Sequence, residues 1–235
     1  NHSGAVSIDT ISWLWSDSEL TGYNESEFEL WVYNSSGWTL LNSTPDTSSN
    51  MLSSYGLNPA SVYGLFGQGI SECTLVNSSG DYTLTADLTR ASNSAGGWAE
   101  ITSACILIQA ANVTIDCDGH SITNTGTPDA GGIVVNGSAD FTYPNVSVFN
   151  CQNISGYEDG IHFRYAWQSN ISSNLLDDND YYGIRVINSS NTNFTNNTMY
   201  NSGYGIALDT DSDDCYIFNN TMVEGLYGIR VSDGS

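Results

Sequence analysis

The last third of the sequence repeats one pattern of glycine, apolar and polar positions about every 23 residues. Gly-Ile pairs recur at spacings of 23, 22 and 23 residues, beginning at Gly160, Gly183, Gly205 and Gly228. An apolar column keeps the same 23-residue spacing, at Val148, Ile171, Phe194 and Ile217. The tract is rich in Asn, Ser, Thr, Gly, Ile and Tyr, which favours short strands and turns over helices. A period in the low twenties without a leucine ladder predicts a parallel β-helix with one coil per repeat.

Each coil is expected to hold short strands joined by turns. One group is predicted at 183–186, 205–208 and 228–231, and a second group at 193–196 and 216–219. A column of asparagines, spaced by 23 residues, lies between them at Asn174, Asn197 and Asn220, with Cys151 23 residues earlier. Equivalent positions on neighbouring coils stack about 4.8 Å apart. The asparagine amides are therefore predicted to form a structural ladder at a turn.

Upstream of residue 150 the period loosens, but the pattern persists. The run that starts at Asn112 (Asn-Val-Thr-Ile-Asp-Cys) resembles the run that starts at Asn145 (Asn-Val-Ser-Val-Phe-Asn-Cys), which predicts two earlier coils with a longer insert. Cys117 and Cys151 then lie at similar positions on neighbouring coils, at a separation that a disulfide can close. Cys73 and Cys105 flank the first coil and could staple its open end. Cys215 remains, either buried or with a partner outside this chain, and the connectivity stays open at this point.

The first seventy residues lack the period. Alternating apolar runs at 6–15, 27–33, 37–41 and 61–67 are separated by Ser, Asn, Gly and Pro, which predicts an antiparallel sheet. The turn Asn34-Ser-Ser-Gly37 indicates a hairpin. The sequence thus predicts a small antiparallel β-sandwich-like domain at 1–70 and a β-helix at 71–235, with the boundary near 68–72. A partial sandwich has an exposed edge that can recruit a strand from another chain.

Charge excludes several classes of function. The chain of 235 residues has 26 acidic and 4 basic residues, all arginine, for a net charge of -22. A nucleic-acid binder or a surface for anionic lipid needs basic residues, so neither is expected. Chemistry that depends on lysine is excluded as well, because the sequence has none. No apolar run reaches about 18 residues, so no membrane insertion is predicted.

N-glycosylation sequons are more frequent than chance predicts from the Asn, Ser and Thr content. They fall at Asn1, Asn24, Asn34, Asn42, Asn77, Asn112, Asn136, Asn145, Asn153, Asn170, Asn188, Asn193, Asn196 and Asn219. This excess predicts an extracellular, cell-surface chain that carries covalent N-glycans. Asn196 and Asn219 also fit a structural explanation, in which the repeat itself favours Asn-Asn-Thr.

Metal binding has one acidic candidate. Carboxylates at Asp209, Asp211 and Asp213 stand at alternate positions and could converge on a calcium ion, although a solvated acidic turn is the plainer interpretation. No cofactor is expected to be required. The histidines His2, His120 and His162 do not cluster in sequence, so they predict no metal site.

Catalytic residues are not evident. Asp209 and Asp213 superficially resemble polygalacturonase acids but lie four residues apart rather than a full coil, and no lysine is available. The arginines Arg164, Arg185 and Arg230 nearly align by period. They could line a groove for an anionic sugar or offset neighbouring acids. Tyrosines before the Gly-Ile strands could bind sugar rings or cover a coil corner: Tyr157, Tyr181, Tyr182, Tyr204 and Tyr227.

A family resemblance rests on the run from Cys73 through Gly80-Asp-Tyr-Thr-Leu, the run Cys105-Ile-Leu-Ile-Gln-Ala-Ala-Asn-Val-Thr-Ile-Asp-Cys-Asp-Gly-His, and the later Asn-Asn-Thr and Tyr-Gly-Ile repeats. Over about residues 70–235 the sequence resembles NosD/CASH-type domains of archaeal-like surface proteins. The resemblance implies a right-handed parallel β-helix. It implies no catalytic set, although the family includes members tied to polysaccharides.

The sequence therefore predicts a non-enzymatic structural glycoprotein, a subunit of a self-assembling extracellular filament or surface layer. The chain stops midway through a coil without a polar cap, and an uncapped coil exposes backbone donors and acceptors that stack on another coil. Copies of the chain are the expected partners, joined head to tail or by strand exchange. The alternative is a carbohydrate-binding or carbohydrate-processing β-helix module.

Overall fold

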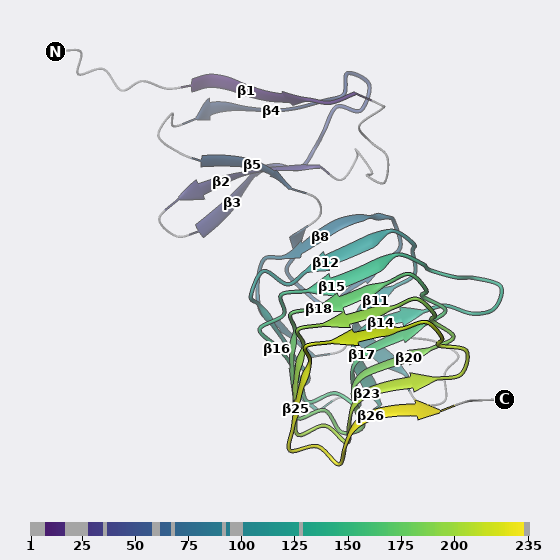
Figure 1. Cartoon of the computed structure of the whole chain (residues 1–235). Coiled ribbons are helices and arrows are strands. Elements are labelled where there is room, and N and C mark those ends of the chain that lie inside the picture. The colour runs from purple at the N-terminus through teal and green to yellow at the C-terminus, as the bar shows by residue number, and fades with distance from the viewer. Residues whose placement is uncertain are drawn as a thin grey trace. The chain divides into compact units, whose positions relative to one another are not determined.

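The computed structural model of the chain describes residues 8–16, 28–34, 37–57, 62–66, 69–90, 93–94, 101–126 and 129–232. Their regular secondary structure consists of β-strands (Figure 1). None of the described segments forms a helix long and apolar enough to cross a membrane. The chain divides into two compact units, Asn1–Gly69 and Ile70–Ser235, which are described in turn below.

The second unit is a parallel β-helix, as the repeat predicts. Each coil passes through three parallel sheets, here called sheets 1, 2 and 3 in chain order. Sheet 1 contains β6 (Gly69–Ile70), β8 (Gly80–Leu84), β12 (Val113–Asp116), β15 (Val146–Phe149), β18 (Asn170–Ser172), β21 (Asn193–Thr195) and β24 (Tyr216–Phe218). Sheet 2 contains β9 (Leu88–Thr89), β13 (Ser121–Thr123), β16 (Asn153–Ser155), β19 (Leu175–Asp177), β22 (Thr198–Tyr200) and β25 (Thr221–Val223). The layers are stacked along the helix axis in Figure 1.

Sheet 3 carries the longest strands of the later coils. It contains β11 (Ser103–Ile108), β14 (Ala130–Asn136), β17 (Asp159–Arg164), β20 (Tyr182–Ile187), β23 (Tyr204–Asp209) and β26 (Tyr227–Ser232). At its first edge β11 also pairs with β7 (Thr74–Val76) and, antiparallel, with β10 (Asn93–Ser94). The strands predicted for sheets 1 and 3 are confirmed. The strands of sheet 2 were not predicted, because three residues are too few to show an alternation.

The apolar columns form the core. Ile171 pairs with Val148 on one side and with Phe194 on the other, and all three side chains are fully buried. Burial of one such side chain contributes roughly 1.5–3 kcal/mol. In sheet 3 the isoleucine of each Gly-Ile pair forms a second column, in which Ile161, Ile184 and Ile206 are fully buried.

The glycines of the Gly-Ile pairs are required by close approach between coils. A Cβ atom added at Gly160, Gly183 or Gly205 would lie only 2.8, 2.8 or 2.6 Å from the carbonyl oxygen of the equivalent glycine on the next coil. Backbone oxygen atoms cannot move away as a flexible side chain can, so any larger residue shifts the stacking. At Gly228, on the last coil, the nearest atom would be 3.5 Å away.

Coil corners use residues with a left-handed backbone. The corner between sheets 1 and 2 places Asn150, Ser173, Asn196 and Asn219 at φ values of 60°, 58°, 57° and 55°. The corner between sheets 2 and 3 does the same with Asp178, Asn201 and Glu224. Asn and Asp tolerate this conformation better than other residues with a side chain. The repeat is rich in asparagine partly for this reason.

Two disulfides tie the first coils together. Cys73 bonds to Cys105, and Cys117 bonds to Cys151. Both pairings agree with those expected from the coil positions. Cys215 is a half-buried free cysteine, and burial raises the pKa of its thiol.

The first unit contains two small antiparallel sheets. One pairs β1 (Ile8–Leu14) with β4 (Met51–Leu57), and the other orders β3 (Gly37–Asn42), β2 (Glu29–Asn34) and β5 (Val62–Phe66) as β3-β2-β5. The predicted hairpin is confirmed, since Asn34 pairs with Gly37 across the turn. Strand β4 was missed, because Met-Leu-Ser-Ser-Tyr-Gly-Leu shows no clear alternation.

Candidate functional site

Three columns of side chains lie on the outer face of sheet 3 and carry most of the polar chemistry of the β-helix. The first column is Asp159, Tyr182, Tyr204 and Tyr227. The second is His162, Arg185, Ala207 and Arg230. The third is Arg164, Ile187, Asp209 and Ser232. The second and third columns are two residues apart on each strand and therefore point to the same face. The first column is three residues before the second, and direct contacts such as that of Asp159 with His162 place it beside them.

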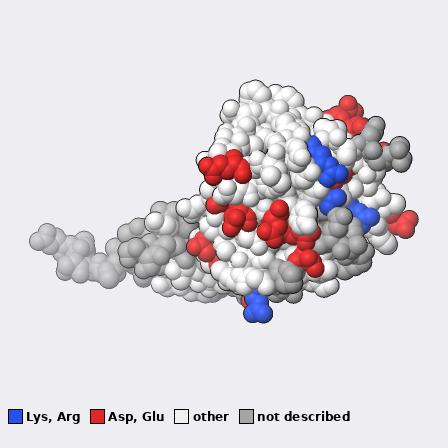
Figure 2. Space-filling model, turned by 90° about the horizontal axis from the view of Figure 1, so that it is seen from below, with Lys and Arg blue, Asp and Glu red and all other residues white. Residues whose placement is uncertain are grey.

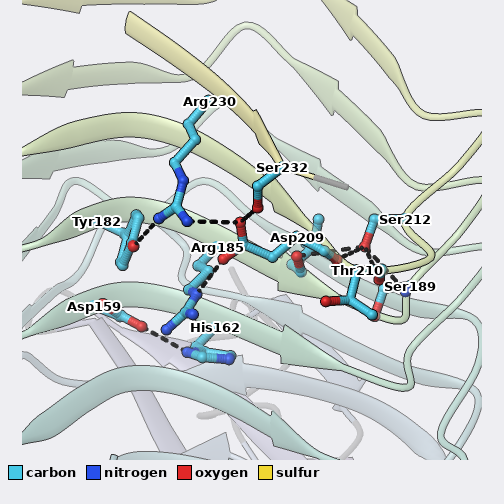
Figure 3. A network of polar contacts seen from close by, with 11 residues as sticks. Asp159, His162, Tyr182, Arg185, Ser189, Asp209, Thr210, Ser212, Arg230 and Ser232 are labelled. Carbon is cyan, nitrogen blue, oxygen red and sulfur yellow. Dashed lines mark hydrogen bonds and ion pairs between the residues drawn. The ribbon is translucent and has the colours of Figure 1, made fainter. Parts of the chain in front are cut away.

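Asp209 is the centre of this face (Figure 3). Its Oδ2 accepts a hydrogen bond from Nε of Arg185 at 2.9 Å, and its Oδ1 lies 3.7 Å from the guanidinium of Arg230. Ser232 also bonds to Oδ1 through its hydroxyl group. The Asp209 and Arg185 side chains are only 7% and 12% exposed, whereas Arg230 is 36% exposed. The prediction that these arginines offset neighbouring acids is thus confirmed for Arg185 and Arg230.

The tyrosines of the first column stack on one another. Ring centroids are 5.2 Å apart between Tyr182 and Tyr204, and 4.9 Å apart between Tyr204 and Tyr227. The guanidinium of Arg230 lies over the Tyr204 ring and donates a 2.6 Å hydrogen bond to the hydroxyl of Tyr182. Burial raises the pKa of Tyr182, and the charges of Arg185 and Arg230 act in the opposite direction. Arg230 therefore links the last coil to the two coils before it.

Two of the five predicted tyrosines lie outside this stack. Tyr157 is fully buried in the core, where burial raises its pKa, so it is not part of an exposed stripe. Tyr181 is 57% exposed, and its ring is tilted against that of Tyr182. The stack consists of Tyr182, Tyr204 and Tyr227, and because Tyr182 is only 7% exposed, the exposed stripe that the sequence predicts is shorter still.

Asp159 and His162 form a second polar pair on the same face. Oδ2 of Asp159 lies 2.6 Å from Nδ1 of His162, and both side chains are buried. Sequence reasoning missed Asp159. Its place three residues before His162 in a Gly-Ile strand is too weak a signal by itself. Aligning Asp159 with Tyr182 by the 23-residue period would have placed it at the head of the tyrosine column.

The proposed calcium ligands are not gathered at one point. Asp209 ends strand β23 and faces the arginines, while Asp211 and Asp213 lie exposed in the following turn. Among the described residues, no group of three or more His, Cys, Asp or Glu side chains is placed to hold a metal ion. The alternate spacing of these aspartates did not predict their positions, because Asp209 belongs to a strand whereas Asp211 and Asp213 belong to the turn that follows it. The period aligns Asp209 with Ile187 and Ser232, two positions after the Arg185 and Arg230 column, and by itself does not predict the contacts with the arginines.

Charged side chains are unevenly distributed on the side of the molecule that Figure 2 shows. Figure 2 shows acidic side chains spread over this side of the molecule, with most of the visible arginine surface gathered in one area. Arg164, the third predicted arginine, lies 5.5 Å from the ring of Tyr165 rather than at Asp209. Of the two arginines at Asp209, Arg230 is the more exposed, at 36% against 12% for Arg185.

The predicted asparagine ladder is present. Asn174 accepts a hydrogen bond from the backbone of Cys151, and Asn197 and Asn220 continue the ladder on the next two coils.

The sequons are scattered over the surface. Asn1 and Asn24, and the side chain of Asn34, lie outside the described residues. Asn77, Asn112, Asn145, Asn193, Asn196 and Asn219 are exposed, and Asn42, Asn136, Asn153, Asn170 and Asn188 are half-buried. Glycosylation stays a prediction.

Comparison with known proteins gives one match. A family model described as "Periplasmic copper-binding protein (NosD)" matches residues 105–235, more than half of the chain. No curated protein and no solved structure matches the chain.

The described residues do not fit a copper site. Copper in proteins is bound mainly by His, Cys and Met side chains. Four of the cysteines are in disulfides, His120 lies 3.2 Å from Asp87, and His162 is buried against Asp159. His2 lies outside the described residues. Among the described residues, no group of three or more His, Cys, Asp or Glu side chains is placed to hold the metal named in the family description.

Proposed function

The chain belongs to the NosD family, and we propose that it is a non-enzymatic structural glycoprotein located outside the cytoplasm, a subunit of a filament or surface layer built from copies of itself. The two disulfides and the description of the family as periplasmic support this location. The polar groups of sheet 3 support a structural role, because Asp209 is occupied by two arginines and the Asp159–His162 pair is buried.

The observation that carries the proposal is the in-register stacking of the coils, since a coil that no other coil covers, as at β26, presents apolar side chains. Ile229 and Val231 occupy the inward-facing columns of sheet 3, yet they are 49% and 74% exposed. Their equivalents one coil earlier, Ile206 and Leu208, are 0% and 9% exposed. One further coil would bury both side chains, at roughly 1.5–3 kcal/mol for each.

The backbone at this end favours the same kind of partner. The strands β24, β25 and β26 each pair with a strand on one side, and their other edges face away from the described coils. Such edges bind another strand readily. Because the ends of a β-helix are different surfaces, contact between them joins copies head to tail and continues into a filament.

Negative-stain electron microscopy of the native protein tests the proposal, and filaments or a lattice are the expected result. The Val231→Lys variant should keep the fold, because this side chain is exposed in a single chain, but should form no assemblies. Phe141→Lys is the matched control, since Phe141 is 68% exposed and lies in an earlier coil. Discrete particles from the native protein, or assemblies of the Val231→Lys variant, would refute self-assembly through this end.

A carbohydrate-binding or carbohydrate-processing module is the second candidate. It is favoured by the stacked rings of Tyr204 and Tyr227 beside Arg230, since Tyr227 is 59% exposed. Aromatic faces with a few polar groups are suited to sugar rings. A glycan array with the native chain and a Tyr227→Ala variant tests it. Binding that the variant loses would favour this candidate, and an empty array would remove it.

A further inference from the structure

Five sequons lie at coil corners where the backbone itself accounts for the asparagine. Their φ values are between 50° and 59°, at Asn112, Asn145, Asn188, Asn196 and Asn219. Asparagine occupies left-handed positions also where no sequon is present, as at Asn150, Asn191 and Asn201. Asn is one of the few residues with a side chain that adopts this conformation at low cost. A sequon at a corner is therefore no sign of a glycan.

Other sequon side chains are already used in the fold. Nδ2 of Asn42 donates to the carbonyl oxygen of Ser53 at 2.7 Å, and Nδ2 of Asn170 donates to the hydroxyl of Ser172 at 3.2 Å. Asn153 is half-buried, with its Oδ1 atom inside the protein. Asn136, at the end of β14, is half-buried as well. The amide nitrogen that would carry a glycan is thus engaged at Asn42 and Asn170, and the residue is partly enclosed at Asn136 and Asn153.

Asn77 and Asn193 have neither explanation. Both side chains are exposed, and neither residue is among the described residues with positive φ. Asn193 opens strand β21 on the outer face of sheet 1, a position where Asn is intrinsically disfavoured. Asn77 lies in the turn before β8, where the hydroxyls of Ser78 and Tyr82 are 2.8 Å apart and hold the turn. Each asparagine is thus presented to solvent without a structural need for its side chain.

We infer that Asn77 and Asn193 are the glycan acceptors among the described sequons, and that the corner sequons follow from backbone geometry. The inference rests on the proposed location outside the cytoplasm. The donor is a lipid-linked glycosyl phosphate, which a glycosyltransferase supplies. Nδ2 of the asparagine forms a bond to the anomeric carbon, the bond from that carbon to the phosphate oxygen breaks, and the amide nitrogen loses one proton. The lipid phosphate is the leaving group.

Glycopeptide mass spectrometry of the protein purified from the cells that make it tests this assignment. Glycan masses are expected on the peptides of Asn77 and Asn193 and not on those of the five corner asparagines. Glycans at the corners with Asn77 and Asn193 bare would overturn the inference, and so would a chain without any glycan.

Variants that remove the sequon but keep the asparagine sharpen the test. Ser79→Ala and Thr195→Ala should each remove one glycan from the intact mass. Thr221→Val is the matched control: it removes the sequon of Asn219 and should leave the glycan mass unchanged. A loss of glycan in this control would contradict the assignment. The result is independent of self-assembly, because a glycosylated chain that forms no filaments would refute only the proposed subunit role.

Discussion

Oδ1 of Asn197 lies 3.1 Å from the backbone nitrogen of Asn174 and 3.0 Å from its Nδ2, one coil earlier in the β-helix. The Nδ2 atom of Asn197 in turn donates to the carbonyl oxygen of Ile171 at 2.8 Å. Asn220 repeats the same contacts with Asn197 and Phe194. One amide per coil therefore satisfies a backbone donor and a backbone acceptor at a corner where the strand ladder is interrupted.

Replacement of Asn197 by alanine should be strongly destabilising. It leaves the N–H of Asn174 and the carbonyl group of Ile171 without these partners, in a part of the chain that is buried. Each unsatisfied group costs about 1–3 kcal/mol, so we expect a loss of about 3 kcal/mol in the free energy of unfolding, measured with urea. Gln152→Ala, at an exposed position of an earlier coil, is the control and should change it by less than about 0.5 kcal/mol. Equal effects of the two substitutions would contradict the role of the ladder.

The ladder and the β-helix were predictable because both depend on one period. Val148, Ile171 and Phe194 repeat at 23 residues because they stack in register, so spacing in sequence maps directly onto spacing along the axis. The contacts around Asp209 were not predictable in the same way. They join different columns, Arg185 on one coil and Arg230 on another, and the direction of each long side chain is decided by packing rather than by the period.

The two ion pairs of Asp209 should differ in strength. Arg185 is mostly buried and bonds at 2.9 Å, whereas Arg230 is more exposed and lies at 3.7 Å. Solvent screening weakens exposed pairs to about 0–1 kcal/mol, while residues within one buried network couple by about 0.5–3 kcal/mol. Double-mutant cycles with Asp209→Asn should therefore give a larger coupling for Arg185→Gln than for Arg230→Gln. The reverse order would show that the buried contact is not the stronger one.

Asp87 should contribute stability that is lost in acid. The backbone N–H of Ser121, and then His120, donate to its carboxylate and hold its pKa below the usual range. A depressed folded-state pKa means that the contribution is present above the unfolded-state value, about 3.9, and is lost as the pH falls from there through the folded value. NMR titration of the carboxyl carbon should show the low midpoint. In the His120→Ala variant the titration midpoint of Asp87 should rise but stay below the usual range, because the backbone N–H of Ser121 still donates to the carboxylate. A midpoint of Asp87 at the ordinary value in the native chain would refute this account.

The Cys117–Cys151 disulfide should matter more than the free Cys215. It closes a loop with a sequence separation of 34, which in the chain-entropy model corresponds to about 3–4 kcal/mol. Thermal unfolding of Cys117→Ala/Cys151→Ala should show a lower midpoint, and Cys215→Ser should change it little. A large effect of Cys215→Ser with none from the double variant would show that these coils are held by packing alone.

Gly183→Ala and Gly228→Ala should have different effects, because Gly183 is covered by the next coil of the same chain, whereas Gly228 would be covered only by a second copy in an assembly. At Gly183 the added Cβ would lie 2.8 Å from the carbonyl oxygen of Gly205 and 2.7 Å from Cγ of Met199. The cost of overpacking, about 1–3 kcal/mol, should exceed the gain of about 0.4–1 kcal/mol from a stiffer unfolded chain.

A Cβ added at Gly228 would lie 3.5 Å from its nearest neighbour, the sulfur of Met222, and would therefore not be overpacked. Only the stabilisation from a stiffer unfolded chain remains, so the isolated Gly228→Ala chain should unfold at the same or a higher temperature. If a second copy covers the last coil as each coil covers the one before it, a backbone carbonyl oxygen of that copy would clash with the Cβ added at Gly228. Gly228→Ala should then weaken assembly in electron micrographs without weakening the fold. Assemblies as abundant as those of the native chain would mean that the copies do not meet in the register of the β-helix.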